Sequence, residues 1–172
     1  MTGGGTLLPE PWRDLLVVAG AKAQGLVSLN NRLMKVVFDT SLLAAAARSK
    51  NGASHALLSK MPDVRFQTVV SVPLFFEYRS VLLRPENMLQ RSPAQTEAFL
   101  DFLLSASHLQ EVFFLWRPAL PDPDDDLILE LAVAAGCRYI VTHNLRDFRG
   151  TEKWGIMALS PAVFLKLIEK AT

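Results

Sequence analysis

The sequence predicts an α/β protein in which a mainly parallel β-sheet is covered by helices on both faces. Three observations lead to this prediction. The chain has 172 residues, which is enough for one domain with a sizeable core. Its residues are 50% hydrophobic and 20% charged, as in folded globular proteins. Short apolar runs also alternate with stretches of helical periodicity, and strands separated by helices form parallel sheets.

In the first half of the domain, two short apolar runs are predicted as buried strands, each followed by helical sequence. The run Lys35–Phe38 ends in a polar cluster, which is typical of a buried parallel strand. After the second strand, Ser71 supplies a capping hydroxyl and Pro73 a first-turn proline, so a helix is expected there, ending at Pro85. The predicted elements are strand 35–38, helix 41–47, helix 53–61, strand 65–70 and helix 71–83.

The second half continues the alternation. A serine followed by a proline, at residues 92 and 160, combines a capping hydroxyl with a first-turn proline and begins a helix at each place. Gly136 ends the helix that begins in the acidic run 122–126, because glycine commonly follows the last helical residue. The predicted elements are a helix from 92, strand 112–116, helix 122–135, strand 138–142, strand 156–159 and helix 160–170.

Residues 1–33 differ from the rest and are predicted as an N-terminal extension of the domain at residues 34–172. The extension begins with a glycine-rich stretch, and a short helix is expected over about residues 12–23. Two interpretations stay open. The segment is a native extension, or Met34 is the natural start and the preceding residues come from a misassigned upstream start.

Composition excludes several classes of protein. The net charge of +1 means that any nucleic-acid binding must come from a local patch. Cys137 is the sole cysteine, which excludes an internal disulfide and a thiolate zinc site, and we expect it to be buried. No apolar run approaches the ~18 residues of a membrane span and no signal-peptide pattern is present, so a cytoplasmic protein without membrane contact is expected. The sequence also lacks the nucleophile elbow of serine hydrolases and the glycine-rich phosphate and dinucleotide loops.

Carboxylates occur at four places that the predicted topology brings to one edge of the sheet. Asp39 directly follows the first strand, and Asp147 lies in the turn after strand 138–142. The run 122–126 contains four aspartates, and Glu77 lies in an apolar helical stretch. Each has a structural alternative: a helix cap, a capped turn, an acidic helix start and a solvated surface acid, respectively. Because active sites of parallel sheets lie beyond the carboxyl ends of the strands, we expect the four to converge.

Clustered oxygen ligands of this kind favour Mg²⁺ or Mn²⁺, hard ions that keep several waters and contact substrate phosphate. A divalent cation would also relieve the repulsion among the aspartates of the run 122–126. Such sites hydrolyse phosphodiester bonds, since the metal activates water and stabilises negative charge in the transition state.

Four stretches of the sequence occur together in a familiar order: Lys35–Thr40, Ser71–Arg84, Asp122–Ala132 and Val141–Phe148. Together they resemble the PIN-domain family, most closely the VapC-like toxins of bacterial toxin–antitoxin systems, and the resemblance extends over about residues 34–170. It implies a three-layer α/β/α sandwich with a central, mainly parallel sheet. It also implies a Mg²⁺-dependent endoribonuclease that forms a homodimer and is inhibited by a cognate antitoxin protein.

By this resemblance, Asp39 matches the first acid of the family, Glu77 the second and Asp125 the third. Asp147 supplies the fourth, because Asn144 stands where many relatives carry an aspartate. Asp39 and Asp125 would ligate the main metal ion, and Glu77 and Asp147 would position water or a second ion. The residues expected to support these acids or to contact substrate are Thr40, Asp122, Asp124, Asp126, Thr142 and Asn144.

The expected function is metal-dependent hydrolysis of RNA by the toxin of a type II toxin–antitoxin pair. Two alternatives stay open. One is a non-catalytic PIN-fold module that binds RNA or protein, and the other is a DNA or flap nuclease on the same fold. The presence of all four acids argues against a decayed site.

Overall fold

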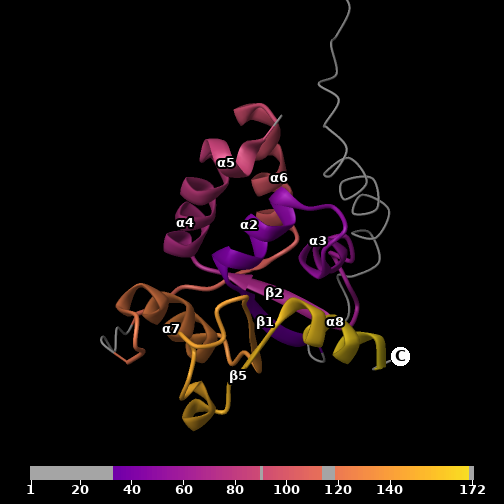
Figure 1. Ribbon diagram of the computed structural model, residues 1–172. Coiled ribbons are helices and arrows are strands. Elements are labelled where there is room, and N and C mark those ends of the chain that lie inside the picture. The colour runs from indigo at the N-terminus through magenta and orange to yellow at the C-terminus, as the bar shows by residue number, and fades with distance from the viewer. Residues whose placement is uncertain (1–32, 90, 114–118, 171–172) are drawn as a thin grey trace, which may run out of the picture.

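The computed structural model describes residues 33–89, 91–113 and 119–170, with a five-stranded sheet at the centre (Figure 1). The strands are β1 (Met34–Phe38), β2 (Phe66–Val70), β3 (His108–Leu109), β4 (Tyr139–Val141) and β5 (Met157–Leu159). They lie in the order β3-β2-β1-β4-β5, and every neighbouring pair is parallel. The predicted parallel sheet is therefore confirmed, with β1 in its middle.

The described residues also form seven α-helices and two 3₁₀-helices. These are α2 (Thr40–Arg48), α3 (Ala53–Leu58), α4 (Val72–Leu82), α5 (Pro85–Met88), α6 (Pro93–Ser105), η2 (Pro123–Asp125), α7 (Asp126–Ala134), η3 (Thr151–Trp154) and α8 (Pro161–Lys170). At the start of α4, the Ser71 hydroxyl accepts a hydrogen bond from the N–H of Leu74 at 3.3 Å. Ser92 and Gln95 form a capping box at the start of α6. The predicted starts of α4 and α6 are therefore confirmed. They could be predicted because each cap is formed by residues that are close together in the sequence.

Helices cover both faces of the sheet, which confirms the α/β/α layers. On one face, the ring centroid of Phe164 in α8 lies 6.5 Å from that of Phe38 and 5.5 Å from that of Phe66. On the other face, α7 contacts β1, β2 and β4, and the Lys35 ammonium donates to the carbonyl of Ala135 at 3.2 Å. Lys35 and Phe38 point to opposite faces because side chains alternate along a strand. Figure 1 shows α7 and α8 on opposite sides of the strands.

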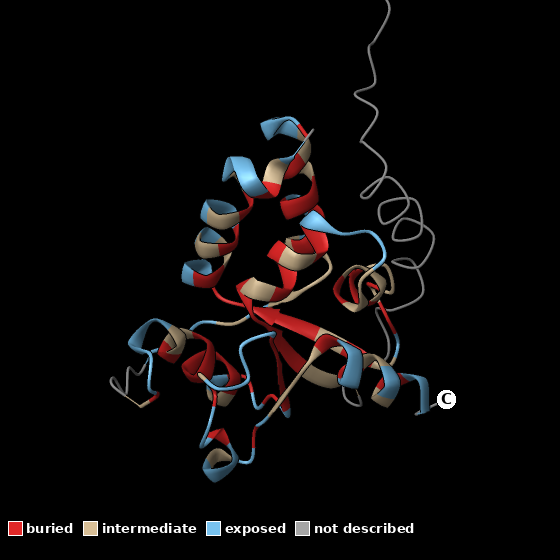
Figure 2. Cartoon of the chain, viewed as in Figure 1, coloured by how far each residue is buried: buried red, intermediate tan, exposed pale blue. Residues whose placement is uncertain are grey.

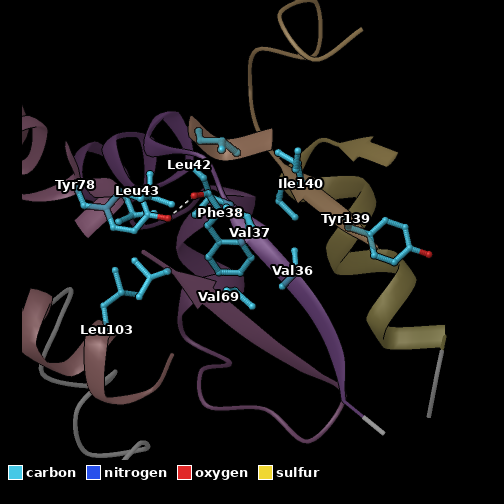
Figure 3. Packing of buried hydrophobic residues seen from close by; sticks show 14 of the residues in the cluster. Val36, Val37, Phe38, Leu42, Leu43, Val69, Tyr78, Leu103, Tyr139 and Ile140 are labelled. Atoms are coloured by element: carbon cyan, nitrogen blue, oxygen red, sulfur yellow. Dashed lines mark hydrogen bonds between the residues drawn. The ribbon is translucent and has the colours of Figure 1, made fainter. Parts of the chain in front are cut away.

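The core is built around β1. Val36 and Val37 are 0% exposed and Phe38 is 1% exposed. Figure 3 shows these side chains among Val69 of β2 and Ile140 of β4. Burial follows the strands, while the outward faces of the surrounding helices are exposed (Figure 2). The end of β1 is therefore packed within the hydrophobic core at the point where the chain reaches the candidate site.

The predicted third strand is wrong in position. Val112 and Phe113 form no strand, and the rest of the range 112–116 lies outside the described residues. The edge strand is His108–Leu109, which pairs with the end of β2. Phe113 is 77% exposed, so the apolar run that predicted a strand is not buried at this residue. The short helices α5 and η3 are not predicted either, because four residues carry too little periodicity.

Three other expectations bear on the overall fold. Cys137 is buried, as predicted, and burial raises the pKa of its thiol to about 12. The expected helix over residues 12–23 lies outside the described residues, and β1 begins at Met34. In the part of the chain that the structure describes, no helix has the length and apolar character needed to cross a membrane.

Candidate active site

Asp39 directly follows β1 and lies at the carboxyl edge of the sheet. Its backbone N–H donates to the carbonyl of Val141 at 2.9 Å, which extends the pairing of β1 with β4. The residue is 4% exposed, and its Oδ2 accepts hydrogen bonds from the hydroxyls of Ser41 and, at 2.6 Å, Thr142. Asp39 occupies the N-cap position of α2, yet its carboxylate makes no capping hydrogen bond to the described residues of that helix. Helix capping therefore does not account for this buried carboxylate.

Glu77 reaches the same region from α4. Its side chain is half-buried, and Oε1 accepts a hydrogen bond from the Thr40 hydroxyl at 2.5 Å. Burial raises the pKa of Glu77, and the hydrogen bond from Thr40 lowers it. The negative charges of Asp39 and Asp124 raise this pKa further, the nearby Arg84 lowers it, and the net shift is upward. Glu77 is therefore not a freely solvated surface acid.

Asp125 stands at the junction of η2 and α7. It is partly buried, and none of the described residues donates a hydrogen bond to its carboxylate. Burial raises its pKa to about 7, and the negative charges of four other acids contribute to this rise: Asp39, Asp122, Asp147 and Glu77. Because charge–charge effects weaken with distance, the four predicted catalytic acids lie within electrostatic reach of a common point.

The turn after β4 supplies a hydroxyl and the fourth acid. Thr142 is fully buried, and its hydroxyl donates to Asp39 and accepts from the backbone N–H of Asn144 at 2.8 Å. The backbone N–H of Asp147 donates to the Asn144 carbonyl at 3.0 Å, and the Asp147 side chain is half-buried. Asn144 itself is exposed and, among the described residues, takes part in this network through its backbone alone.

The remaining aspartates of the acidic run have different surroundings. Asp126 is 0% exposed, and its carboxylate accepts from the backbone N–H groups of Ala119 at 3.1 Å and Leu120 at 2.8 Å. It therefore fastens the preceding loop and does not face the other acids as a free carboxylate. Asp122 is exposed and caps η2 by accepting from the N–H of Asp124 at 3.0 Å.

Two serines that the sequence did not single out, Ser41 and Ser54, join the network together with His143. The Ser41 hydroxyl, which donates to Asp39, also accepts from the backbone N–H of His143 at 3.1 Å. The Nε2 atom of His143 lies 2.7 Å from the hydroxyl of Ser54, which is buried on α3. The position of Ser41, two residues after Asp39, is a usable signal. Ser54 and His143 are 89 residues apart, and no local pattern indicates their contact.

The donor set of the site fits a hard divalent cation. Four carboxylate groups offer oxygens that accept no hydrogen bond from any described residue: Oδ1 of Asp39, Oε2 of Glu77, and both oxygens of Asp125 and Asp147. Carboxylate oxygens are the ligands that Mg²⁺ and Mn²⁺ prefer. A cation would also offset the repulsion that, together with the larger effect of burial, raises the pKa of Asp125. Within the described ranges, no cluster of three or more acidic, histidine or cysteine side chains is positioned to hold an ion. Mg²⁺ commonly uses one or two carboxylates and completes its shell with water.

Comparison with known protein families gives a match over more than half of the 172 residues. The matching family model is described as PIN domain and covers residues 35–146. This range contains Asp39, Glu77 and Asp125, and it ends one residue before Asp147. The sequence matches no curated protein. Three of the four predicted acids thus lie inside the matched region.

Proposed function

The chain belongs to the PIN-domain family, whose members are generally nucleases, and from this premise we propose that it is a metal-dependent endoribonuclease. The observation that carries the proposal is the environment of Asp125. Acids from separate segments of the chain act on this one partly buried carboxylate at the carboxyl edge of the sheet. Converging carboxylates of this kind suit a divalent cation and phosphodiester hydrolysis.

In this proposal, Asp39 and Asp125 hold Mg²⁺ or Mn²⁺, and Glu77 and Asp147 complete the acidic rim. When bound, such an ion supplies activation of water and stabilisation of negative charge on the phosphate. The partial burial of Glu77 and Asp125 makes their carboxylates costly to leave uncompensated, which favours a cation at this place.

Hydroxyl groups of the chain hold these carboxylates in place. Ser41 and Thr142 both donate to Oδ2 of Asp39, which leaves Oδ1 available to a ligand. Thr40 donates to Oε1 of Glu77 and leaves Oε2 available in the same way. Fixed carboxylates need little reorganisation when substrate binds, and outer hydrogen-bond partners of this type support metal affinity and activity.

Replacing Asp39 with Asn tests the proposal. The wild-type chain is expected to cleave single-stranded RNA with Mg²⁺ and to lose this activity with EDTA. Asp39→Asn is expected to reduce the cleavage rate by more than roughly hundredfold, since losing even an outer partner of a metal ligand costs about 10–100-fold. Asp101→Asn, an exposed aspartate on α6, is the matched control and should keep full activity. Cleavage that survives Asp39→Asn contradicts the proposal.

Two substrates distinguish the alternatives. RNA and single-stranded DNA of the same base sequence are offered to the wild-type chain in parallel. Cleavage of DNA in preference to RNA would indicate a DNA nuclease on this fold. RNA binding without cleavage of either substrate would indicate a non-catalytic binding module.

We further propose that the ribonuclease is the toxin of a type II toxin–antitoxin pair, which acts in the cytoplasm as a homodimer and is inhibited by an antitoxin protein. The proposal rests on the resemblance of the four sequence motifs to VapC-like toxins. Expression of the wild-type chain should arrest growth of a bacterial host, and Asp39→Asn should not. Co-expression of the adjacent small reading frame should restore growth, and light scattering should give the mass of two chains. Normal growth despite active ribonuclease would exclude the toxin role.

A further inference from the structure

The peptide group that joins Phe38 to Asp39 is held at both of its ends. Its N–H, which belongs to Asp39, donates to the carbonyl of Val141 in β4 at 2.9 Å. Its C=O, which belongs to Phe38, accepts a hydrogen bond from the hydroxyl of Tyr78 (Figure 3). The N–H and C=O of a trans peptide point in opposite directions, so β4 holds one side of this group and α4 holds the other.

The Phe38 carbonyl needs a donor from outside the sheet. The last registered pair between β1 and β2 is Val36 with Thr68, so Phe38 lies beyond that ladder. Phe38 is 1% exposed, and a buried carbonyl without a partner is costly. Tyr78, which is 2% exposed, supplies the missing donor from α4. The hydroxyl thus completes the hydrogen bonding of β1 at the residue before the first acid.

Tyr78 is also the neighbour of Glu77, whose carboxylate accepts a hydrogen bond from Thr40. Two adjacent residues of α4 therefore bond to two points on either side of Asp39. Tyr78 bonds to the residue before it, and Glu77 bonds to the residue after it. These two hydrogen bonds connect α4 to the residues on either side of Asp39, and so connect the backbone of Asp39 to the residue that carries the Glu77 carboxylate.

We propose that Tyr78 is a positioning residue, whose hydroxyl holds the backbone of Asp39 and the spacing of Asp39 from Glu77 in the form that binds metal. The inference rests on the proposed function as far as RNA cleavage is concerned. Its effect on metal binding is measurable without any RNA. Tyr78 contacts neither the substrate nor the ion and acts through the backbone of Asp39.

The test replaces one hydroxyl and keeps the ring. Tyr78→Phe removes the donor to Phe38, and Tyr139→Phe is the matched control. Tyr139 is also buried, its ring packs against Phe164, and its hydroxyl makes no hydrogen bond with any described residue. Binding of Mn²⁺ alone is followed by electron paramagnetic resonance of the free ion. We expect Tyr78→Phe to weaken Mn²⁺ binding by about tenfold, within the range for outer partners of metal ligands, and Tyr139→Phe to leave it unchanged.

Cleavage kinetics provide a second readout that general destabilisation does not move. At a temperature where circular dichroism shows each variant folded, Tyr78→Phe should lower kcat and raise the Mg²⁺ concentration for half-maximal rate, with KM for RNA unchanged. Wild-type Mn²⁺ affinity in folded Tyr78→Phe, or an equal loss in Tyr139→Phe, would overturn the inference.

A second pair of variants tests the same arrangement from its other end. Thr40→Val removes the hydrogen bond to Glu77, and Thr40→Ser keeps it. Thr40→Val should weaken Mn²⁺ binding, and Thr40→Ser should bind Mn²⁺ as the wild-type chain does. If both variants weaken Mn²⁺ binding equally, the proposed spacing is contradicted. If the wild-type chain binds Mn²⁺ and Tyr78→Phe does so weakly, but no RNA is cleaved, the ribonuclease proposal fails and the positioning inference stands. If wild-type and Tyr78→Phe cleave RNA equally well, the ribonuclease proposal stands and the positioning inference fails.

Discussion

Two buried aspartates of this protein differ in the donors that surround them. Asp39 is bonded through Oδ2 to hydroxyl groups, and its Oδ1 accepts no hydrogen bond among the described residues. Asp126 is bonded through both oxygens to backbone N–H groups of the loop that precedes it. One carboxylate is therefore held but still able to bind a ligand, while the other is fully used within the fold. Burial alone does not distinguish these two roles, because both residues are less than 5% exposed.

We predict that Asp126→Asn destabilises the protein. Both backbone N–H groups, those of Ala119 and Leu120, donate to Oδ1, and that of Ala119 also donates to Oδ2. In the amide one of these oxygens becomes an NH₂ group that cannot accept, so at least one buried hydrogen bond is lost and two donors face each other. The free energy of unfolding should fall by about 1–3 kcal/mol in urea denaturation. Asp124→Asn, an exposed change in the same run, should stay close to the wild-type value. Equal stability of the two variants would show that Asp126 does not fasten the loop.

The raised pKa of Asp125 predicts how stability depends on pH in the metal-free protein. Because the pKa of this carboxyl is about 7 in the folded chain, well above its ordinary value, the folded state binds the proton more tightly than the unfolded state. The stability from this group is present below the unfolded pKa and is lost as pH rises through about 7. Unfolding temperatures without metal should therefore fall as pH rises from about 4 to about 7 and level off above that, and Asp125→Asn should remove this part of the decline.

Metal binding should show the opposite trend with pH. A cation competes with the proton on Asp125, so the rise in unfolding temperature caused by Mg²⁺ should be larger at about pH 8 than at pH 6. Asp125→Asn should abolish most of this Mg²⁺ effect. A Mg²⁺ effect that is independent of pH would argue against Asp125 as a ligand.

At the scale of the secondary-structure elements, the sequence predicts the helix starts and strands that depend on contacts between neighbouring residues. The helix α4 begins where Ser71 and Pro73 indicate, because its cap is formed within four residues. The sequence pattern predicts the edge strand too late in the chain, because the two residues of β3 are selected by pairing with β2 and not by an apolar pattern of their own. Periodicity therefore predicts the central strands well and this short edge strand poorly.

The capping box of α6 gives a prediction about this element alone. The Ser92 hydroxyl accepts from the N–H of Gln95 at 3.3 Å, and the Gln95 side chain accepts from the N–H of Ser92 at 2.7 Å. Ser92→Ala should lower the free energy of unfolding by about 1 kcal/mol in urea denaturation. Catalytic rates should not change, because none of the four acids lies on α6. A loss of activity in folded Ser92→Ala would connect α6 to the site.

At the scale of the whole molecule, the predicted topology places the acids at one edge of the sheet, but it does not show how they are held. Because parallel strands share a carboxyl edge, the sequence predicts Asp39 and Asp147 on the same side of the sheet. The contacts of Tyr78 with Phe38 and of His143 with Ser54 join residues 40 and 89 positions apart. No local pattern encodes such contacts, because they depend on how α3 and α4 pack against other helices of the fold.

The nearly neutral net charge of the chain makes individual arginines near the site important for substrate binding. With a net charge of +1, the acidic site of the proposed ribonuclease must rely on particular cations to attract an RNA backbone. Arg84 is exposed, its guanidinium has no hydrogen-bond or ion-pair partner among the described residues, and it lies near enough to Glu77 to lower that residue's pKa. Arg79, on α4, is paired with Glu97 at 2.5 Å. Arg84 is therefore the better placed of the two to bind phosphate.

We predict that Arg84→Gln raises KM for RNA by roughly three- to tenfold with little change in kcat, because a phosphate contact contributes to binding and not to the reacting atoms. The slope of log KM against log salt concentration should fall by about one, the value expected for one lost phosphate contact. Arg79→Gln is the control, and its effect should be smaller because Glu97 already occupies that guanidinium. If both variants change KM and its salt dependence equally, RNA is attracted by the combined positive charge near the site, and Arg84 makes no specific contact with the substrate.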